Sequence, residues 1–138
     1  MNNRFKFRVW DKITNQYLQE LGIYYWHIPY SLDGEEITGE ANLVGLSELL
    51  KHDNFVTQQY TGLNDNNDDP IYEGDILKNH YDVGNNIIGQ VLYESDHGGY
   101  IFQWKRKGRG QDYKNLNCDV AFESVIVGNK FEHSELLN

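Results

Sequence analysis

The sequence contains a single cysteine, Cys118, in 138 residues. One cysteine cannot form a disulfide within the chain, and it cannot supply a zinc site built on cysteine ligands. No activating base is evident beside it, so the sequence predicts a buried structural thiol at Cys118 and not a reactive one.

Long hydrophobic runs are also missing. No segment approaches the roughly 20 apolar residues that a helix needs to cross a bilayer. The first residues, MNNRFKFRVW, lack the continuous apolar stretch of a secretory signal. We therefore expect a cytoplasmic protein that does not contact membranes.

Basic residues are scarce, with 12 Lys and Arg against 21 Asp and Glu, which gives a formal net charge of -9. An acidic excess of this size repels nucleic acid and anionic membranes overall. The charge is uneven, because residues 1–12 carry +3, residues 105–114 carry +4 and residues 13–104 carry -13. The sequence thus describes an acidic body with two basic strips.

Proline is rare, with two residues, whereas glycine occurs 13 times and tyrosine 10 times. Such a composition is typical of many short strands joined by turns. Period-2 alternation and β-branched or aromatic runs predict strands over 4–10, 17–18, 23–28, 55–61, 71–72, 75–79, 87–93, 100–104, 119–122 and 125–127, with a turn over 107–112.

Only one helix is predicted in the N-terminal half, over 43–50, where leucines recur at helical spacing. One further helical turn is expected over 134–137. The fold class that follows is mainly β. Residues 1–54 are expected to form a smaller β-rich part with the short helix, and residues 55–138 a small barrel or sandwich. The alternative is that both parts form one integrated unit.

Candidate catalytic and metal-binding residues do not form a credible site. Asp65, Asn67 and Asp69 match the opening of a calcium loop, but Pro70 and Ile76 stand where that loop needs Gly and Glu. The five histidines lack metal-ligand spacing. Ser95-Asp96-His97 are consecutive, so their side chains diverge and cannot form a triad. Glu73 and Asp75 are better explained by a turn. We predict no catalytic residue, metal or cofactor.

The second basic strip consists of Lys105, Arg106, Lys107 and Arg109, and it follows the aromatic run Tyr100–Trp104. Basic residues beside exposed aromatic rings are typical of a groove for single-stranded nucleic acid. However, Tyr100, Phe102 and Trp104 share one face of a strand, and such a face is more often part of a core. The strip can equally be a solvated loop or a contact to an acidic neighbouring subunit.

Three segments resemble the YopX family of phage and prophage proteins. The first is Lys6–Asp11 (KFRVWD) and the last is Val125–Leu137. The central one is the longest and most specific, and reads QYTGL-x-D-x-N-x-x-x-IYEGDI. Its residues are Gln59, Tyr60, Thr61, Gly62, Leu63, Asp65, Asn67, Ile71, Tyr72, Glu73, Gly74, Asp75 and Ile76. Asp68 and Ser134 depart from the family pattern, and both are expected in turns.

The resemblance implies a bacterial host cell, an SH3-like β barrel in the C-terminal half and no catalytic residues to carry over. Read physically, the central motif places Gly and Asp at turns between apolar residues, which favours a structural role. We therefore expect a non-enzymatic phage accessory protein that acts by binding, as a homo-oligomer. Two alternatives remain: an acidic inhibitor that mimics phosphate charge toward a host nucleic-acid-binding protein, and a nucleic-acid-binding module that uses the Lys105–Arg109 strip.

Overall fold

The computed structural model describes residues 6–22, 24–29, 42–82, 85–106, 108 and 110–138. The described residues fall into two compact units, Lys6–Gln59 and Tyr60–Asn138. Strand β6 (Phe55–Asn64) begins in the first unit and ends in the second. The division expected between residues 54 and 55 stays a prediction.

The N-terminal unit is built from two small antiparallel sheets. In the first, β1 (Phe7–Asp11) pairs with β2 (Gln16–Tyr17) and with the first half of β6. In the second, β4 (Tyr25–Ile28) lies between β3 (Gln19–Gly22) and β5 (Asn42–Gly45). The core of this unit consists of Val9, Trp26, Ile28, Leu49 and Phe55.

The helix expected over 43–50 is shorter than predicted. Helix α1 spans Leu46–Leu49, and the residues before it form β5. Val44 pairs with Trp26 and packs against the core, whereas Leu43 and Leu50 are exposed. A single helical turn has little stability of its own, so pairing with β4 determines the conformation of this segment.

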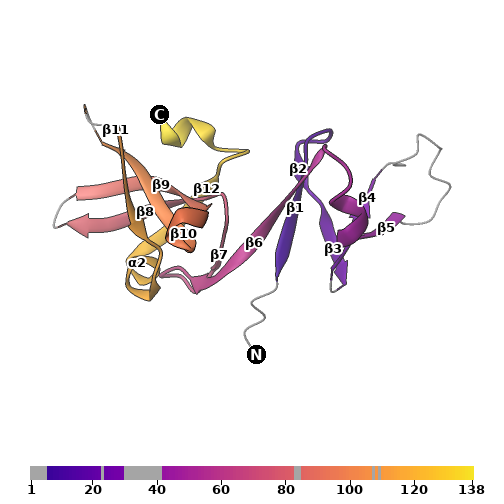
Figure 1. Cartoon of the computed structure of the whole chain (residues 1–138), viewed down its shortest axis with the longest axis horizontal. Helices are drawn as coiled ribbons and strands as arrows, with labels where there is room; N and C mark the ends of the chain where they lie inside the picture. The colour runs from indigo at the N-terminus through magenta and orange to yellow at the C-terminus, as the bar shows by residue number, and fades with distance from the viewer. Residues whose placement is uncertain (1–5, 23, 30–41, 83–84, 107, 109) are drawn as a thin grey trace. The chain divides into compact units, whose positions relative to one another are not determined.

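The C-terminal unit contains a curled, five-stranded antiparallel sheet with the order β11-β10-β9-β8-β12 (Figure 1). Its strands are β8 (Asp75–Asp82), β9 (Asn85–Glu94), β10 (Gly99–Arg106), β11 (Gly110–Asn115) and β12 (Ser124–Asn129). The short β7 (Pro70–Tyr72) pairs with the second half of β6. The mainly β fold is therefore confirmed, while a complete SH3-like barrel stays a prediction.

Two short 3-10 turns complete this unit. The first, η1 (Ser95–His97), joins β9 to β10. The second, η2 (Ser134–Leu137), packs against β9, and it confirms the helical turn expected over 134–137. The turn expected over 107–112 extends too far, because β11 already begins at Gly110 and pairs with β10 up to Arg106.

Residues 119–122 were predicted as a strand, and this prediction is wrong. They lie in α2 (Cys118–Phe122), where the Asn117 side chain accepts a hydrogen bond of 2.9 Å from the Val120 amide. Consecutive Val120 and Ala121 both enter the core, which an alternating strand would not allow. A capped turn that buries two neighbouring residues therefore replaces the strand. Cys118, at the start of α2, is exposed and not buried as expected.

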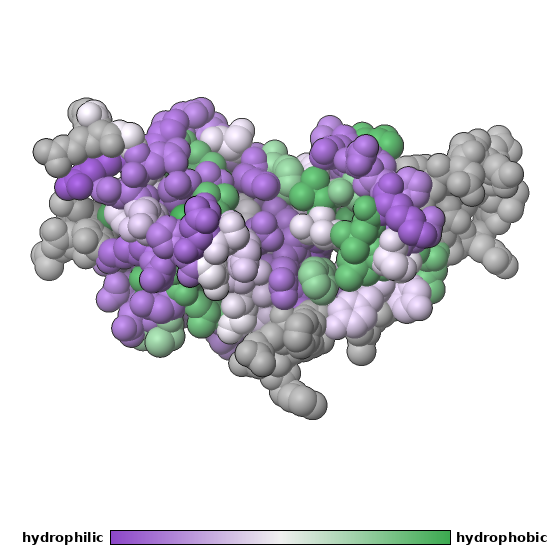
Figure 2. Space-filling model, viewed as in Figure 1, coloured by the Kyte–Doolittle hydropathy of each residue, from purple (hydrophilic) through white to green (hydrophobic). Residues whose placement is uncertain are grey.

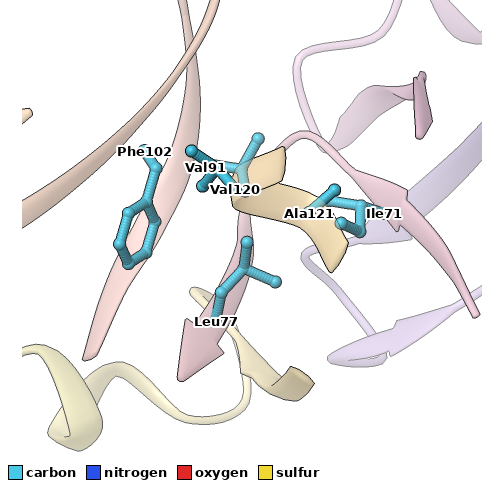
Figure 3. Packing of buried hydrophobic residues seen from close by; sticks show 6 residues of the cluster. All are labelled: Ile71, Leu77, Val91, Phe102, Val120 and Ala121. Carbon is cyan, nitrogen blue, oxygen red and sulfur yellow. The ribbon is translucent and has the colours of Figure 1, made fainter. Parts of the chain in front are cut away.

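The core of the C-terminal unit lies on one face of the five-stranded sheet. Leu77, Val91 and Phe102 project from three strands, and Val120 and Ala121 of α2 lie beside them with Ile71 (Figure 3). All six side chains are almost completely buried. This cluster fixes the inward face of each strand, and alternation then fixes which residues point outward.

Candidate binding surfaces

Asp65 of the central motif is a buried carboxylate, only 5% exposed, and it serves as a structural acceptor. Its Oδ1 accepts hydrogen bonds from the Asn67 and Asp69 amides, both at 2.9 Å. Its Oδ2 accepts one from the Ile126 amide of β12, also at 2.9 Å. The carboxylate thus closes its own loop and attaches that loop to a strand 61 residues away.

Gly74 and Asp75 form the tight bend before β8. Asp75 Oδ2 accepts a 2.8 Å hydrogen bond from the Tyr72 amide, and Gly74 has a φ of 87°, which favours glycine. The Gly74 amide donates to the Val91 carbonyl, and the Gly74 carbonyl accepts from the Lys130 amide. Glu73 and Asp75 therefore flank a structural turn.

Other residues of the central motif stabilise the connection between β6 and β7. Thr61 Oγ1 donates to the Ile71 carbonyl at 2.8 Å, and Gly62 has a φ of 87°. The Tyr60 and Tyr72 rings lie 5.8 Å apart, centroid to centroid. Ile71 and Ile76 are fully buried. Gln59, the first motif residue, pairs with Phe7 of β1. These side chains therefore make contacts within the fold that hold neighbouring strands together.

Acidic and histidine side chains do not converge. Among the residues that the structure describes, there is no group of three or more His, Cys, Asp or Glu that could hold a metal ion. The imidazoles make separate local contacts: His80 Nδ1 lies 2.7 Å from Asn86 Oδ1, and His133 Nδ1 accepts from the Asn129 amide at 3.2 Å. The histidines therefore do not form one site in the described structure.

Two tyrosines have hydroxyls that ionise less readily than usual. Burial is the main cause of the raised pKa of Tyr60, and the Asp68 carboxylate raises it further. Burial also raises the pKa of Tyr100, followed by the nearby Glu73 and Tyr93. Both phenols therefore favour the neutral form in the folded chain more than in the unfolded chain.

This difference predicts a loss of stability at high pH. Below the ordinary tyrosine pKa of about 10, both states hold the proton and the free energy of unfolding is unaffected. As the pH rises above that value, the unfolded state ionises first and stability falls. We expect Tyr60→Phe to reduce the drop in urea midpoint between pH 9 and 11, because the variant lacks the hydroxyl whose pKa is raised in the folded chain.

The two described residues of the second basic strip do not share a surface. Lys105 and Arg106 are consecutive in β10, so they point to opposite faces of the sheet. Arg106 lies on the face that carries Phe102 and pairs with Asp112 at 3.1 Å, while Lys105 points outward. Lys107 and Arg109 lie outside the described residues. The aromatic residues of this strand belong to the core, because Phe102 is fully buried and Tyr100 and Trp104 pack against the cluster.

A row of two exposed side chains and the half-buried Lys78 crosses the outward face of the sheet instead. Lys78 is the partner of Ile88, and the Gly89–Trp104 pair places Ile88 beside Lys105. These three residues, which we call the Ile88 face, come from β8, β9 and β10. Ile88 is 39% exposed, and a hollow of about 30 Å³ beside it is lined by Gln90, Gln103, Trp104, Lys105, Gln111 and Leu137. Sequence reasoning missed this row, because only the strand register brings its members together.

A second exposed feature lies at the end of α2. Phe122 is 70% exposed, and its carbonyl is held by a 2.9 Å hydrogen bond from Asn66 Nδ2. Asp119 and Glu123 are also exposed, at positions three before and one after it. Residues spaced by three and four share one face of a helix. We call Asp119, Phe122 and Glu123 the Phe122 protrusion. The sequence did not reveal it, because residues 119–122 were predicted to form a strand.

The N-terminal unit exposes apolar side chains as well. Tyr25 of β4 is 49% exposed and Leu43 of β5 is 55% exposed, on the side of their sheet away from Trp26. A polar hollow of about 170 Å³ in the same unit is lined by Thr14, Gln16, Tyr17, Leu18, Gln19, His27 and Pro29. The visible side of this unit carries larger hydrophobic areas than that of the C-terminal unit, which is mainly hydrophilic (Figure 2).

None of the helices in the described part of the chain has the length and apolar character to span a membrane.

Comparison with known proteins identifies the family. A search of curated proteins found no match. The crystal structure of protein EF1440 from Enterococcus faecalis is similar to this chain, with a TM-score of 0.52 and 18% sequence identity, over 96% of this chain and 97% of that chain. This likeness shows a shared fold. The family model described as YopX protein matches residues 6–138, which is nearly the whole chain. The chain therefore belongs to the YopX family.

Proposed function

We propose that this chain is a non-enzymatic phage accessory protein that acts in the host cytoplasm by binding other protein chains, and that it self-associates. The observation that carries the proposal is the exposure of Phe122 at 70%, together with the exposed Tyr25 and Leu43, on ordered elements. Contiguous exposed apolar patches mark protein contacts, and aromatic side chains are enriched in them. An anionic or small polar ligand would not account for them.

The central motif supports a binding role indirectly. Two of its three carboxylates, those of Asp65 and Asp75, accept hydrogen bonds from backbone amides, so they are not available to act on a substrate. An active site needs converging polar groups around an accessible space. The hollow beside Ile88 is small, at about 30 Å³, and three of its seven lining residues are glutamine. The exposed surfaces are thus better suited to binding another protein chain than to catalysing a reaction.

Direct nucleic-acid binding through Lys105 and Arg106 receives less support. A groove for a single strand needs basic residues and exposed rings on one surface. Here the two cations lie on opposite faces, Arg106 is paired with Asp112, and Phe102 is fully buried. The overall charge of -9 also opposes a polyanion.

Light scattering coupled to size-exclusion chromatography tests self-association directly. The chain has a mass of 16.1 kDa. At 10–100 µM, roughly the range in which interfaces of modest size assemble, we expect an average mass of at least two chains that falls on dilution. A constant mass of one chain across that range would contradict the proposal.

A further inference from the structure

The outward face of the five-stranded sheet is only partly covered. Ile76 and Ile101 point outward and are almost fully buried, and η2 packs against β9 on the unit's surface (Figure 1). Ile88, two residues before Gln90 on β9, remains 39% exposed. One open part of this face is the Ile88 face, with Lys78 on one side and Lys105 on the other.

The two lysines of this face are unpaired. In the described ranges, neither Lys78 nor Lys105 has a carboxylate within 4.0 Å, whereas Lys51 and Arg106 pair with Glu48 and Asp112. Glu94, at the far end of β9, is the only acid among the described outward positions of β8 to β11. An acidic chain thus holds a local site with an apolar centre and cations on both sides.

The Phe122 protrusion has the opposite charge around the same kind of centre. Asp119 and Glu123 make no ion pair with any residue that the structure describes. The helical turn is continued by a 3.1 Å hydrogen bond from the Glu123 amide to the Asp119 carbonyl, so both carboxylates flank Phe122 on one side. An apolar ring with two carboxylates beside it is opposite in charge to an apolar side chain with an ammonium group on each side.

We propose that the Phe122 protrusion of one copy docks on the Ile88 face of a second copy. The inference rests on the proposed self-association and names its contact. Phe122 packs on Ile88, and Lys78 and Lys105 meet Asp119 and Glu123. The lysines lie two strands apart, about 10 Å between backbones, and their long side chains can converge on carboxylates one helical turn apart. Desolvated aromatic anchors of this kind dominate binding energy in interfaces.

A second copy fits better than nucleic acid as the occupant. A phosphate backbone would satisfy Lys78 and Lys105, but it offers no partner for Ile88 and leaves Phe122 unexplained. The second copy accounts for both exposed apolar residues and for both sets of unpaired charges. It also lets a chain of net charge -9 associate through local pairs, since charges further apart than about 8 Å are screened at physiological salt.

Single-surface variants test the contact. We expect Phe122→Ser to weaken self-association by about 30-fold or more, as for a central aromatic anchor, and the double variant Lys78→Glu/Lys105→Glu to do the same. Leu50→Ser, at another exposed apolar residue, and Lys12→Glu/Lys51→Glu, with an identical change of net charge, serve as controls. Circular dichroism melts establish that each variant is folded.

Mixing the variants gives the decisive measurement. Phe122→Ser keeps an intact Ile88 face, and Lys78→Glu/Lys105→Glu keeps an intact Phe122 protrusion. Each alone should run as a single chain, and an equimolar mixture should form a species of two chains. A wild-type monomer would remove the proposed function itself. A wild-type oligomer that is unchanged by these variants, equally weakened by the controls, or not restored by mixing would overturn this contact and leave self-association standing.

Discussion

Replacing Gly89 by alanine is expected to cost at least about 3 kcal/mol of stability, a large part of what a small domain has. A Cβ at this position would lie 2.3 Å from the Gln103 carbonyl oxygen and 2.8 Å from the Phe102 ring. Gly89 is on β9, directly opposite Trp104 of β10, so the obstruction is the backbone of the neighbouring strand. A backbone within a paired sheet cannot move aside without breaking its ladder.

Gly99 provides the matched control. It lies at the start of β10, no atom lies within 4 Å of a Cβ built on it, and its φ is not positive. Gly99→Ala should therefore be neutral or slightly stabilising, because alanine restricts the unfolded chain more than glycine does. Urea titrations followed by tryptophan fluorescence would compare the two variants. Equal midpoints for Gly89→Ala and the wild type would contradict the close approach of β9 and β10.

Much of the fold can be predicted from alternation. The strands β1, β8, β9 and β10 have the period-2 pattern and lie where it places them. Two segments were predicted with the wrong secondary structure, and both errors have the same cause. Residues 119–122 are rich in strand-forming residues, but the Asn117 cap and the shared burial of Val120 and Ala121 favour a helical turn. Leucine spacing over 43–50 suggests a helix, but Val44 is needed in the sheet beside Trp26. In both places tertiary packing outweighs local preference.

The candidate surfaces were less accessible to sequence reasoning. The structural role of the central motif could be inferred, since Gly and Asp at turns have a local explanation. The hydrogen bond between Asp65 and the Ile126 amide could not be inferred, because it joins residues that are 61 positions apart in the sequence. The separation of Lys105 from Arg106 was predictable from strand alternation alone. To predict that Lys78, Ile88 and Lys105 lie side by side, one must know the pairing register of β8, β9 and β10. The sequence alone does not give that register.

Asp65→Ala is the second change with a large expected effect, a loss of about 3 kcal/mol in the free energy of unfolding. The substitution removes a buried carboxylate and leaves the amides of Asn67, Asp69 and Ile126 without their acceptor. Three hydrogen bonds to a charged acceptor are lost at once, and hydrogen bonds to charged groups contribute more to stability than those between neutral groups. Asp65→Asn should be intermediate, because one oxygen remains while the new amide group opposes an N–H donor.

Asp69→Ala is the control for this prediction, since its side chain is exposed in the same loop and makes no hydrogen bond to any described residue. We expect a change within about 0.5 kcal/mol there, as for most surface substitutions. Hydrogen exchange adds a local measurement: in Asp65→Ala the Ile126 amide should exchange faster relative to the Ile101 amide, which lies in the centre of the sheet. If Asp65→Ala and Asp69→Ala were equally stable, the loop would not depend on this carboxylate. The central motif would then need a role other than joining β6 to β12.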